Sequence, residues 1–185
     1  MALPAFLRGC PFATWWCKSM QTPGWLRRHL PPARRLEWYP PFRAMRIRVR
    51  ELDGEWRKAR ILLPLARNRN PAGGMFGGAM ACLADPIAAL SCSRVFPGYS
   101  VWTRALTLDF LSEGRSDLEL RYVLDPALEA DIRRQLGERG RATPSVEYGF
   151  FDTHGRLCAE VRCRVAIRPA GYQPAFVKHR SSTQP

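Results

Sequence analysis

The sequence GAMACLADPIAALSCSRVF at residues 78–96 decides the fold, because it is the longest apolar stretch in the 185-residue chain. Met80, Leu83, Ile87 and Leu90 recur at helical spacing and form one stripe, while alanines fill the other faces. A helix that is apolar nearly all round must be buried on most of its sides. A Pro-Gly pair directly after this stretch ends the helix.

Alternating apolar and polar residues predict about six strands around this helix. The expected strands are residues 45–50, 56–63, 100–111, 117–124, 142–152 and 157–167. Asp53-Gly54 is a hairpin signal between the first two strands. Two further helices are expected, one at 127–136 and a short one at 25–39 that prolines interrupt, followed by an extended exit at Pro40-Pro41.

One buried helix against one curved antiparallel sheet is an α+β architecture. We expect residues 25–168 to form the folded domain. Residues 1–24 are expected to be a poorly ordered basic extension, and residues 169–185 a loose tail with no periodicity.

The formal net charge of +13 is concentrated near the N-terminus. Residues 1–50 hold ten Lys or Arg and a single acid, Glu37, so the remainder of the chain is only mildly basic. Such a charge favours binding of polyanions such as nucleic acid, anionic lipid or a phosphorylated cofactor. The simpler explanation is a solvated basic surface. The N-terminal segment is also compatible in composition with a mitochondrial presequence.

Six cysteines show neither Cys-x-x-Cys pairs nor a histidine at ligand spacing, so no metal site is expected. Cys82 and Cys92 in the helix, and Cys158 and Cys163 in the last strand, are interpreted as buried free thiols of a reducing compartment. We therefore expect a cytoplasmic protein. No run of about 18 apolar residues exists, so no membrane span is expected.

Two motifs resemble those of phenylacetyl-CoA-thioesterase-like proteins, a branch of the hotdog-fold acyl-CoA thioesterases. The first is Asn70-x-x-Gly73-x-x-x-Gly77-Gly78 followed by Leu83-Ala84-Asp85 in the helix. The second is Thr107-Leu-Asp-Phe-Leu111-x-x-Gly114. The match spans residues 39–168 and is closest to an uncharacterised branch. It implies a hotdog fold, hydrolysis of an acyl-CoA to free acid and coenzyme A, and no cofactor.

Asp85 is the strongest candidate catalytic residue, because it is the only charged residue between Arg69 and Arg94. A buried carboxylate is costly unless it is paired or used, and desolvation raises its pKa toward the range of a general base. Pro86 predicts a kink at this position. The resemblance implies that Asp85 is the general base or nucleophile. The alternative is a structural carboxylate bonded to freed backbone N–H groups or to an arginine.

Gly77 and Gly78 begin the helix, where N–H groups lack partners and the dipole is positive. The resemblance implies that the Gly77 N–H polarises the thioester carbonyl. The alternative is that the two glycines serve only a tight loop and close packing. The resemblance also implies that Gly78, Phe76, Met75 and Arg69 contact the substrate. Relatives usually carry a histidine at the position that matches 75 or 76. This chain has Met75 and Phe76 there, so no imidazole assists the reaction.

Asn70 and Thr103 are weaker candidates. The resemblance implies that Asn70 orients the thioester or water, and that Thr103 steadies the attacking water. Asn70 serves equally well as a cap of its own turn before Pro71. The alternative for Thr103 is an ordinary strand residue.

The resemblance implies self-association as a homodimer or a dimer of dimers, with the helix-start glycine and the carboxylate supplied by different chains. The leading hypothesis is therefore an acyl-CoA thioesterase. A non-catalytic acyl-CoA-binding or regulatory hotdog protein is the second. A nucleic-acid or membrane-surface protein is the third, suggested by Trp15, Trp16 and Trp25 in the basic segment. The chain has no RNA- or DNA-binding motif, so no nucleic-acid partner is expected.

Overall fold

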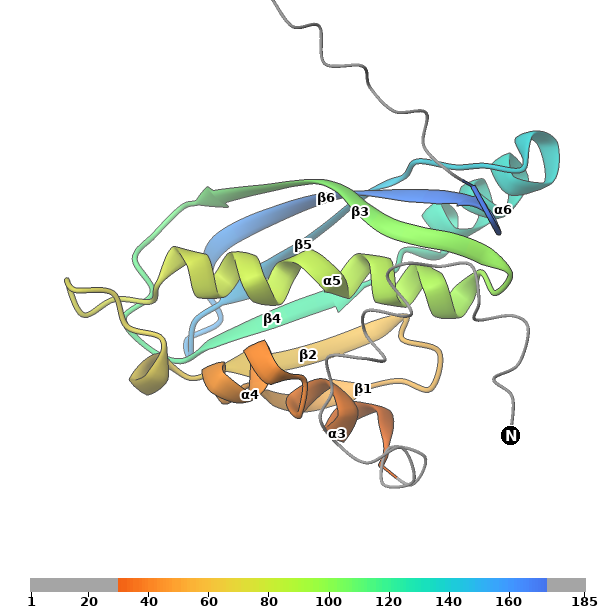
Figure 1. Ribbon diagram of the computed structural model, residues 1–185. Coiled ribbons are helices and arrows are strands. Elements are labelled where there is room, and N and C mark those ends of the chain that lie inside the picture. The colour runs from red at the N-terminus through yellow and green to blue at the C-terminus, as the bar shows by residue number, and fades with distance from the viewer. Residues whose placement is uncertain (1–29, 173–185) are drawn as a thin grey trace, which may run out of the picture.

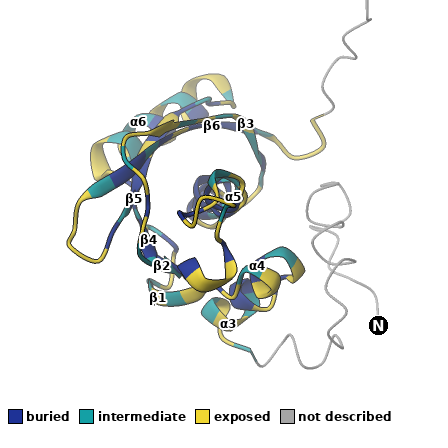
Figure 2. Ribbon diagram, turned by 90° about the vertical axis from the view of Figure 1, so that its left-hand side faces the viewer, coloured by how far each residue is buried: buried dark blue, intermediate teal, exposed yellow. Residues whose placement is uncertain are grey.

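A six-stranded antiparallel sheet curves around helix α5 (Gly77–Val95) in the computed structural model, which describes residues 30–172. The strand order is β1-β2-β4-β5-β6-β3. Figure 1 shows α5 along the concave face of the sheet, and the end-on view of Figure 2 shows the sheet bent around it. This is the predicted hotdog arrangement. The strands are β1 (Arg48–Leu52), β2 (Lys58–Leu63), β3 (Tyr99–Phe110), β4 (Leu118–Val123), β5 (Ser145–Phe151) and β6 (Leu157–Pro169).

The core lies between α5 and the concave face of the sheet. Leu83 and Ile87 of α5 are almost completely buried, as are Leu120, Tyr122 and Phe150 of the sheet. Truncating a leucine in such a position to alanine typically costs about 2–5 kcal/mol of stability. The all-round apolar sequence of α5 thus places the helix where its small residues allow close contact with β3 and β6.

Two short helices, α3 (Pro32–Glu37) and α4 (Pro40–Met45), precede the sheet and correct two expectations. The extended exit predicted at Pro40-Pro41 is wrong, because both prolines lie in the first turn of α4. Proline fits there since its fixed φ is helical and its missing N–H has no intrahelical acceptor. The first strand consequently starts at Arg48 rather than at Met45.

The two edges of the sheet differ. The β1 edge is partly covered by α3, whose Glu37 accepts a hydrogen bond from the Val49 N–H with 2.9 Å between Oε1 and N. The edge strand β3 pairs only with β6 within residues 30–172. Its outer edge therefore carries backbone groups that are available to another chain.

Three further expectations need correction. Trp56 lies in the β1–β2 turn with a φ of 64°, so β2 begins only at Lys58. Ala142 forms an isolated bridge to Ile167, and β5 begins at Ser145. Cys92, Cys158 and Cys163 are buried as predicted, but Cys82 is exposed. The described parts of the proposed domain and tail are residues 30–172, and residues 1–29 and 173–185 lie outside them.

Helix α6 (Pro126–Arg139) confirms the helix expected between the fourth and fifth strands. Asp125 caps it by accepting the Ala127 N–H at 2.7 Å. Glu129 attaches it to the β1–β2 hairpin, because the Arg57 guanidinium donates to both of its carboxylate oxygens at 2.7 and 3.0 Å. These bonds, joined by Arg133, lower the pKa of Glu129 to about 2 despite opposing desolvation.

We expect Glu129→Gln to lower the free energy of unfolding at pH 7 by on the order of 1 kcal/mol. The folded-state pKa of Glu129 is depressed, so its contribution is present above the ordinary value of 4.5 and is lost as the pH falls toward about 2. Urea unfolding at pH 7 and pH 3 should therefore show a smaller difference at pH 3. Glu138→Gln, which removes an exposed partner of Arg134 on the same helix, is the control and should change little. Equal losses in the two variants would contradict the prediction.

Candidate active site

Asp85 lies near the middle of α5, with its side chain half-buried. No lysine, arginine or histidine nitrogen within residues 30–172 approaches its carboxylate to 4.0 Å. Burial raises the pKa of Asp85, and a hydrogen-bonding contribution from Thr103 lowers it in part. A carboxyl group with a raised pKa and no ion pair is suited to accepting and returning a proton near neutral pH.

Hydrogen bonds from two hydroxyl groups of the sheet hold this part of α5 against the sheet. Thr103 on β3 donates its hydroxyl proton to the Asp85 backbone carbonyl at 2.7 Å. Tyr148 on β5 donates to the Ala84 carbonyl at 2.8 Å. The helix continues unbroken past Pro86, whose missing N–H removes one internal hydrogen bond. Thr103 therefore positions the backbone that carries the carboxylate, while its oxygen retains the capacity to accept a bond from water.

Tyr39 and Cys82 also lie close to Asp85. Burial, followed by the charges of Cys82 and Asp85, raises the pKa of Tyr39. Burial, followed by the Asp85 charge, raises the pKa of Cys82. Cys82 precedes Asp85 by three residues, so helical spacing alone places both on one face. Tyr39 comes from the α3–α4 junction, and no local pattern in the sequence indicates that this junction packs against α5.

The helix start is a second cluster. The N–H groups of Gly77 and Gly78 have no acceptor among residues 30–172. A Cβ on Gly77 would lie 3.0 Å from Cζ of Phe110, and a Cβ on Gly78 would lie 2.4 Å from the Phe76 ring. Both rings are more than half exposed. The two glycines therefore combine open amide donors with close contact to two aromatic side chains.

The loop before the helix is closed by Asn70. Its side-chain oxygen accepts the Gly74 N–H at 3.0 Å, and its backbone N–H donates to the Gly74 carbonyl at 2.8 Å. This is the capping role weighed for Asn70 from the sequence. Met75 is buried and donates its N–H to the Gly114 carbonyl at 2.7 Å. Arg69 is exposed, and its backbone forms an isolated β-bridge with Met75.

Asp85 and Thr103 thus lie together with Cys82 and Tyr39, whereas Gly77 and Gly78 lie at the helix start. Gly77 and Asp85 are eight residues apart, which is about 12 Å along the axis of an α-helix. One thioester cannot contact both groups of the same chain. Residues 30–172 contain no cluster of three His, Cys, Asp or Glu side chains that could hold a metal ion, and no helix there is long and apolar enough to cross a membrane.

The fold and the carboxylate-bearing central helix define a hotdog-fold protein. The chain belongs to the family described as domain of unknown function DUF4442, whose model matches residues 34–167. No curated protein sequence matches the chain.

Solved structures share the fold. A protein of unknown function from Pseudomonas aeruginosa, described as a probable thioesterase, is 25% identical, with a TM-score of 0.66 over 82% of this chain and 99% of that one. A thioesterase from Haemophilus influenzae is 16% identical, with a TM-score of 0.53 over 72% of this chain and 85% of that one. The PaaI protein of E. coli, from the phenylacetic acid degradation operon, is 19% identical, with a TM-score of 0.51 over 69% of this chain and 83% of that one.

Proposed function

We propose that this protein hydrolyses an acyl-CoA thioester to a free acid and coenzyme A. The observation that carries the proposal is Asp85 on the central helix of a hotdog fold. It is a half-buried carboxyl group with a raised pKa and no ion pair to any of residues 30–172. The similarity to a Pseudomonas aeruginosa protein described as a probable thioesterase supports the same reaction class.

The chemistry requires only groups that the chain supplies. Asp85 takes a proton from water as the water oxygen attacks the thioester carbon, or attacks that carbon itself to form a mixed anhydride that water hydrolyses to the free acid once the thiol has left. The Gly77 N–H donates to the carbonyl oxygen as negative charge develops there. The C–S bond then breaks, and the leaving thiolate takes up the proton that Asp85 accepted from water, or a proton from solvent where Asp85 is the nucleophile. Thr103 holds the Asp85 backbone in place through its carbonyl.

The two groups must come from two copies of the chain, because about 12 Å of helix separates them within one copy. The outer edge of β3, which pairs with no strand among residues 30–172, supports such pairing. Phe110 and Leu111, at the end of this strand, expose 57% and 56% of their surface beside the helix start. A symmetric pair would bury these side chains and contain two equivalent sites.

One observation favours a second function, which is binding of acyl-CoA without hydrolysis. The Phe76 ring lies over Gly78, and no histidine is present at positions 75 and 76. A ring in this position restricts access to the amide donors of the helix start. A protein of this kind would report on acyl-CoA concentration rather than consume acyl-CoA.

Thiol release from a panel of short-, medium- and long-chain and aromatic acyl-CoAs tests the proposal. We expect saturable thiol release with at least one substrate class. Which class is preferred depends on the space between two assembled copies. The same panel should be titrated calorimetrically. Saturable binding with no thiol release from any substrate would replace hydrolysis with the binding function, and neither binding nor release would contradict both.

A further inference from the structure

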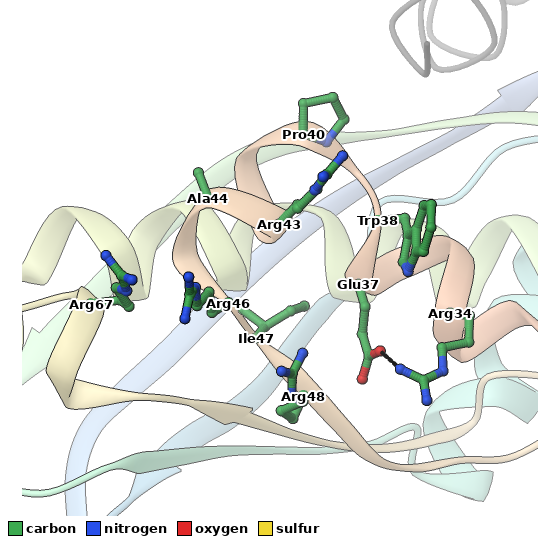
Figure 3. A pocket seen from close by; sticks show the side chains of 10 residues that line it. All are labelled: Arg34, Glu37, Trp38, Pro40, Arg43, Ala44, Arg46, Ile47, Arg48 and Arg67. Carbon is green, nitrogen blue, oxygen red and sulfur yellow. Dashed lines mark hydrogen bonds and ion pairs between the residues drawn. The ribbon is translucent and has the colours of Figure 1, made fainter. Parts of the chain in front are cut away.

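A cavity of about 870 Å³ lies outside the site at Asp85, against α3, α4 and the segment that joins α4 to β1. Its lining is unusually basic. Five arginines contribute to it and Glu37 is the single acid, as Figure 3 shows. The arginines are Arg34, Arg43, Arg46, Arg48 and Arg67.

Most of these positive charges have no anionic partner among residues 30–172. Glu37 pairs with Arg34 at 2.9 Å, and its second oxygen is occupied by the Val49 N–H. The other four arginines approach no carboxylate to 4.0 Å within the described part of the chain. On the convex side of the sheet, by contrast, Arg60 pairs with Glu119. Unpaired guanidinium groups gathered around one cavity repel one another, and a phosphate group would relieve that repulsion through paired N–H bonds.

Arg46 occupies its position at a cost in backbone energy. It ends α4 with φ 54° and ψ 39°, a left-handed conformation that glycine or asparagine usually supplies. The conformation directs the chain into β1, so that Arg46 and Arg48 both line the cavity between Arg67 and Arg34 in the view of Figure 3. The left-handed turn itself closes the end of α4, but glycine would make the same turn without strain, so an arginine kept here is consistent with a role for its side chain.

An aromatic surface adjoins these charges. Trp38 lines the same cavity, is 42% exposed and has the Arg43 guanidinium 5.7 Å from its ring centroid. A planar base can stack on such an indole while neighbouring arginines bind phosphates. We propose that this arginine-lined cavity is a binding site for a nucleotide that carries at least two phosphate groups.

Such a nucleotide has two sources, a free nucleotide or the nucleotide end of an acyl-CoA, and the second source rests on the proposed hydrolysis. The position of the cavity is compatible with both. Trp38 faces the cavity, whereas the next residue, Tyr39, is buried and lies close to Asp85. The α3–α4 junction therefore borders the cavity through Trp38 and is near enough to Asp85 for its charge to act on Tyr39.

Calorimetric titration of the full chain with ADP tests the proposal without any need for turnover. We expect saturable binding that weakens as salt is added, and no binding of adenosine, because phosphate contacts supply the affinity. Arg46→Gly should weaken ADP binding about tenfold or more. The same variant should unfold at an equal or higher urea concentration, because glycine accepts the left-handed conformation without strain. Arg141→Gly removes an exposed arginine outside the cavity and is the matched control.

The two sources are separated by kinetics. If the cavity takes the nucleotide end of the substrate, Arg46→Gly raises KM for acyl-CoA, leaves kcat unchanged and has no effect on an acyl-pantetheine thioester, which lacks the nucleotide. If it takes a free nucleotide, Arg46→Gly weakens ADP binding and leaves KM for acyl-CoA unchanged. Absence of ADP binding to the wild-type chain, equal binding of adenosine, or equal weakening by Arg46→Gly and Arg141→Gly would each overturn the proposal.

Discussion

Asp85→Asn is expected to lower thiol release from an acyl-CoA at least about a hundredfold, because the amide cannot accept a proton from water or attack the thioester carbon. Asparagine has nearly the shape of aspartate, and the Thr103 hydrogen bond goes to the backbone carbonyl, so α5 should keep its place. Substrate binding should change little, and the loss should appear in kcat. Asp131→Asn, a matched change on α6, should retain the wild-type rate.

The pH dependence gives a second readout of the same residue. Wild-type kcat/KM should fall as the pH decreases through the raised pKa of Asp85, because the protonated carboxyl is no base.

The stability of the folded chain should change with pH in the opposite sense. A carboxyl whose folded pKa is raised binds protons more readily when folded, so stability decreases as the pH rises from the ordinary value through the raised one. Asp85→Asn should therefore unfold at a higher urea concentration than the wild type at pH 7, with little difference at pH 3. Equal rates of thiol release in the two proteins would remove Asp85 from the mechanism.

Gly77→Pro is expected to lower kcat about a hundredfold to a thousandfold by removing a single N–H donor. Gly77 is the first residue of α5, the position at which proline is best accommodated, and Phe76 already has an extended conformation. The change therefore deletes the donor while preserving the helix. Gly77→Ala is the control, since it adds a Cβ close to Phe110 but keeps the N–H. Similar losses in the two variants would show that packing, not hydrogen bonding, accounts for this glycine.

Mixing the Gly77→Pro and Asp85→Asn chains tests whether one site uses both copies. After joint unfolding and refolding, mixed pairs would contain one site with an intact Gly77 and an intact Asp85. We expect roughly a quarter of the wild-type activity, because half of random pairs are mixed and each has one working site. If both groups acted within one chain, every site would lack one of them, and the mixture would stay inactive.

The fold could be predicted from local patterns because its main elements are locally encoded. The all-apolar helix, the alternating strands and α6 follow from side-chain periodicity, and their bounds in the structure differ by only a few residues. The failures involve positions that short patterns do not distinguish. Pro40 and Pro41 can end an extended segment or begin a helix, and only packing of α4 decides between these.

The candidate site was predictable only where its residues share one element. Asp85 is distinctive as a lone charge in an apolar helix, and Cys82 could have been added from its spacing. The exposure of Cys82 could not be predicted from spacing, because it depends on which face of α5 the sheet of the same chain leaves uncovered. Tyr39 depends on a contact between elements more than forty residues apart in sequence, which no periodicity encodes. The arginine-lined cavity likewise joins Arg67 to residues of α3 and α4 only after folding.

The hydrogen bond between Glu37 and Val49 has a consequence for the size of any assembly. Strand-to-strand association can extend indefinitely into fibres when a sheet offers two free borders, and it terminates when only one is available. With α3 covering part of the β1 edge, two molecules that pair through β3 occupy the more open sheet edge of both. Pairing through β3 would then stop at two molecules, and further growth at the β1 edge would have to displace α3.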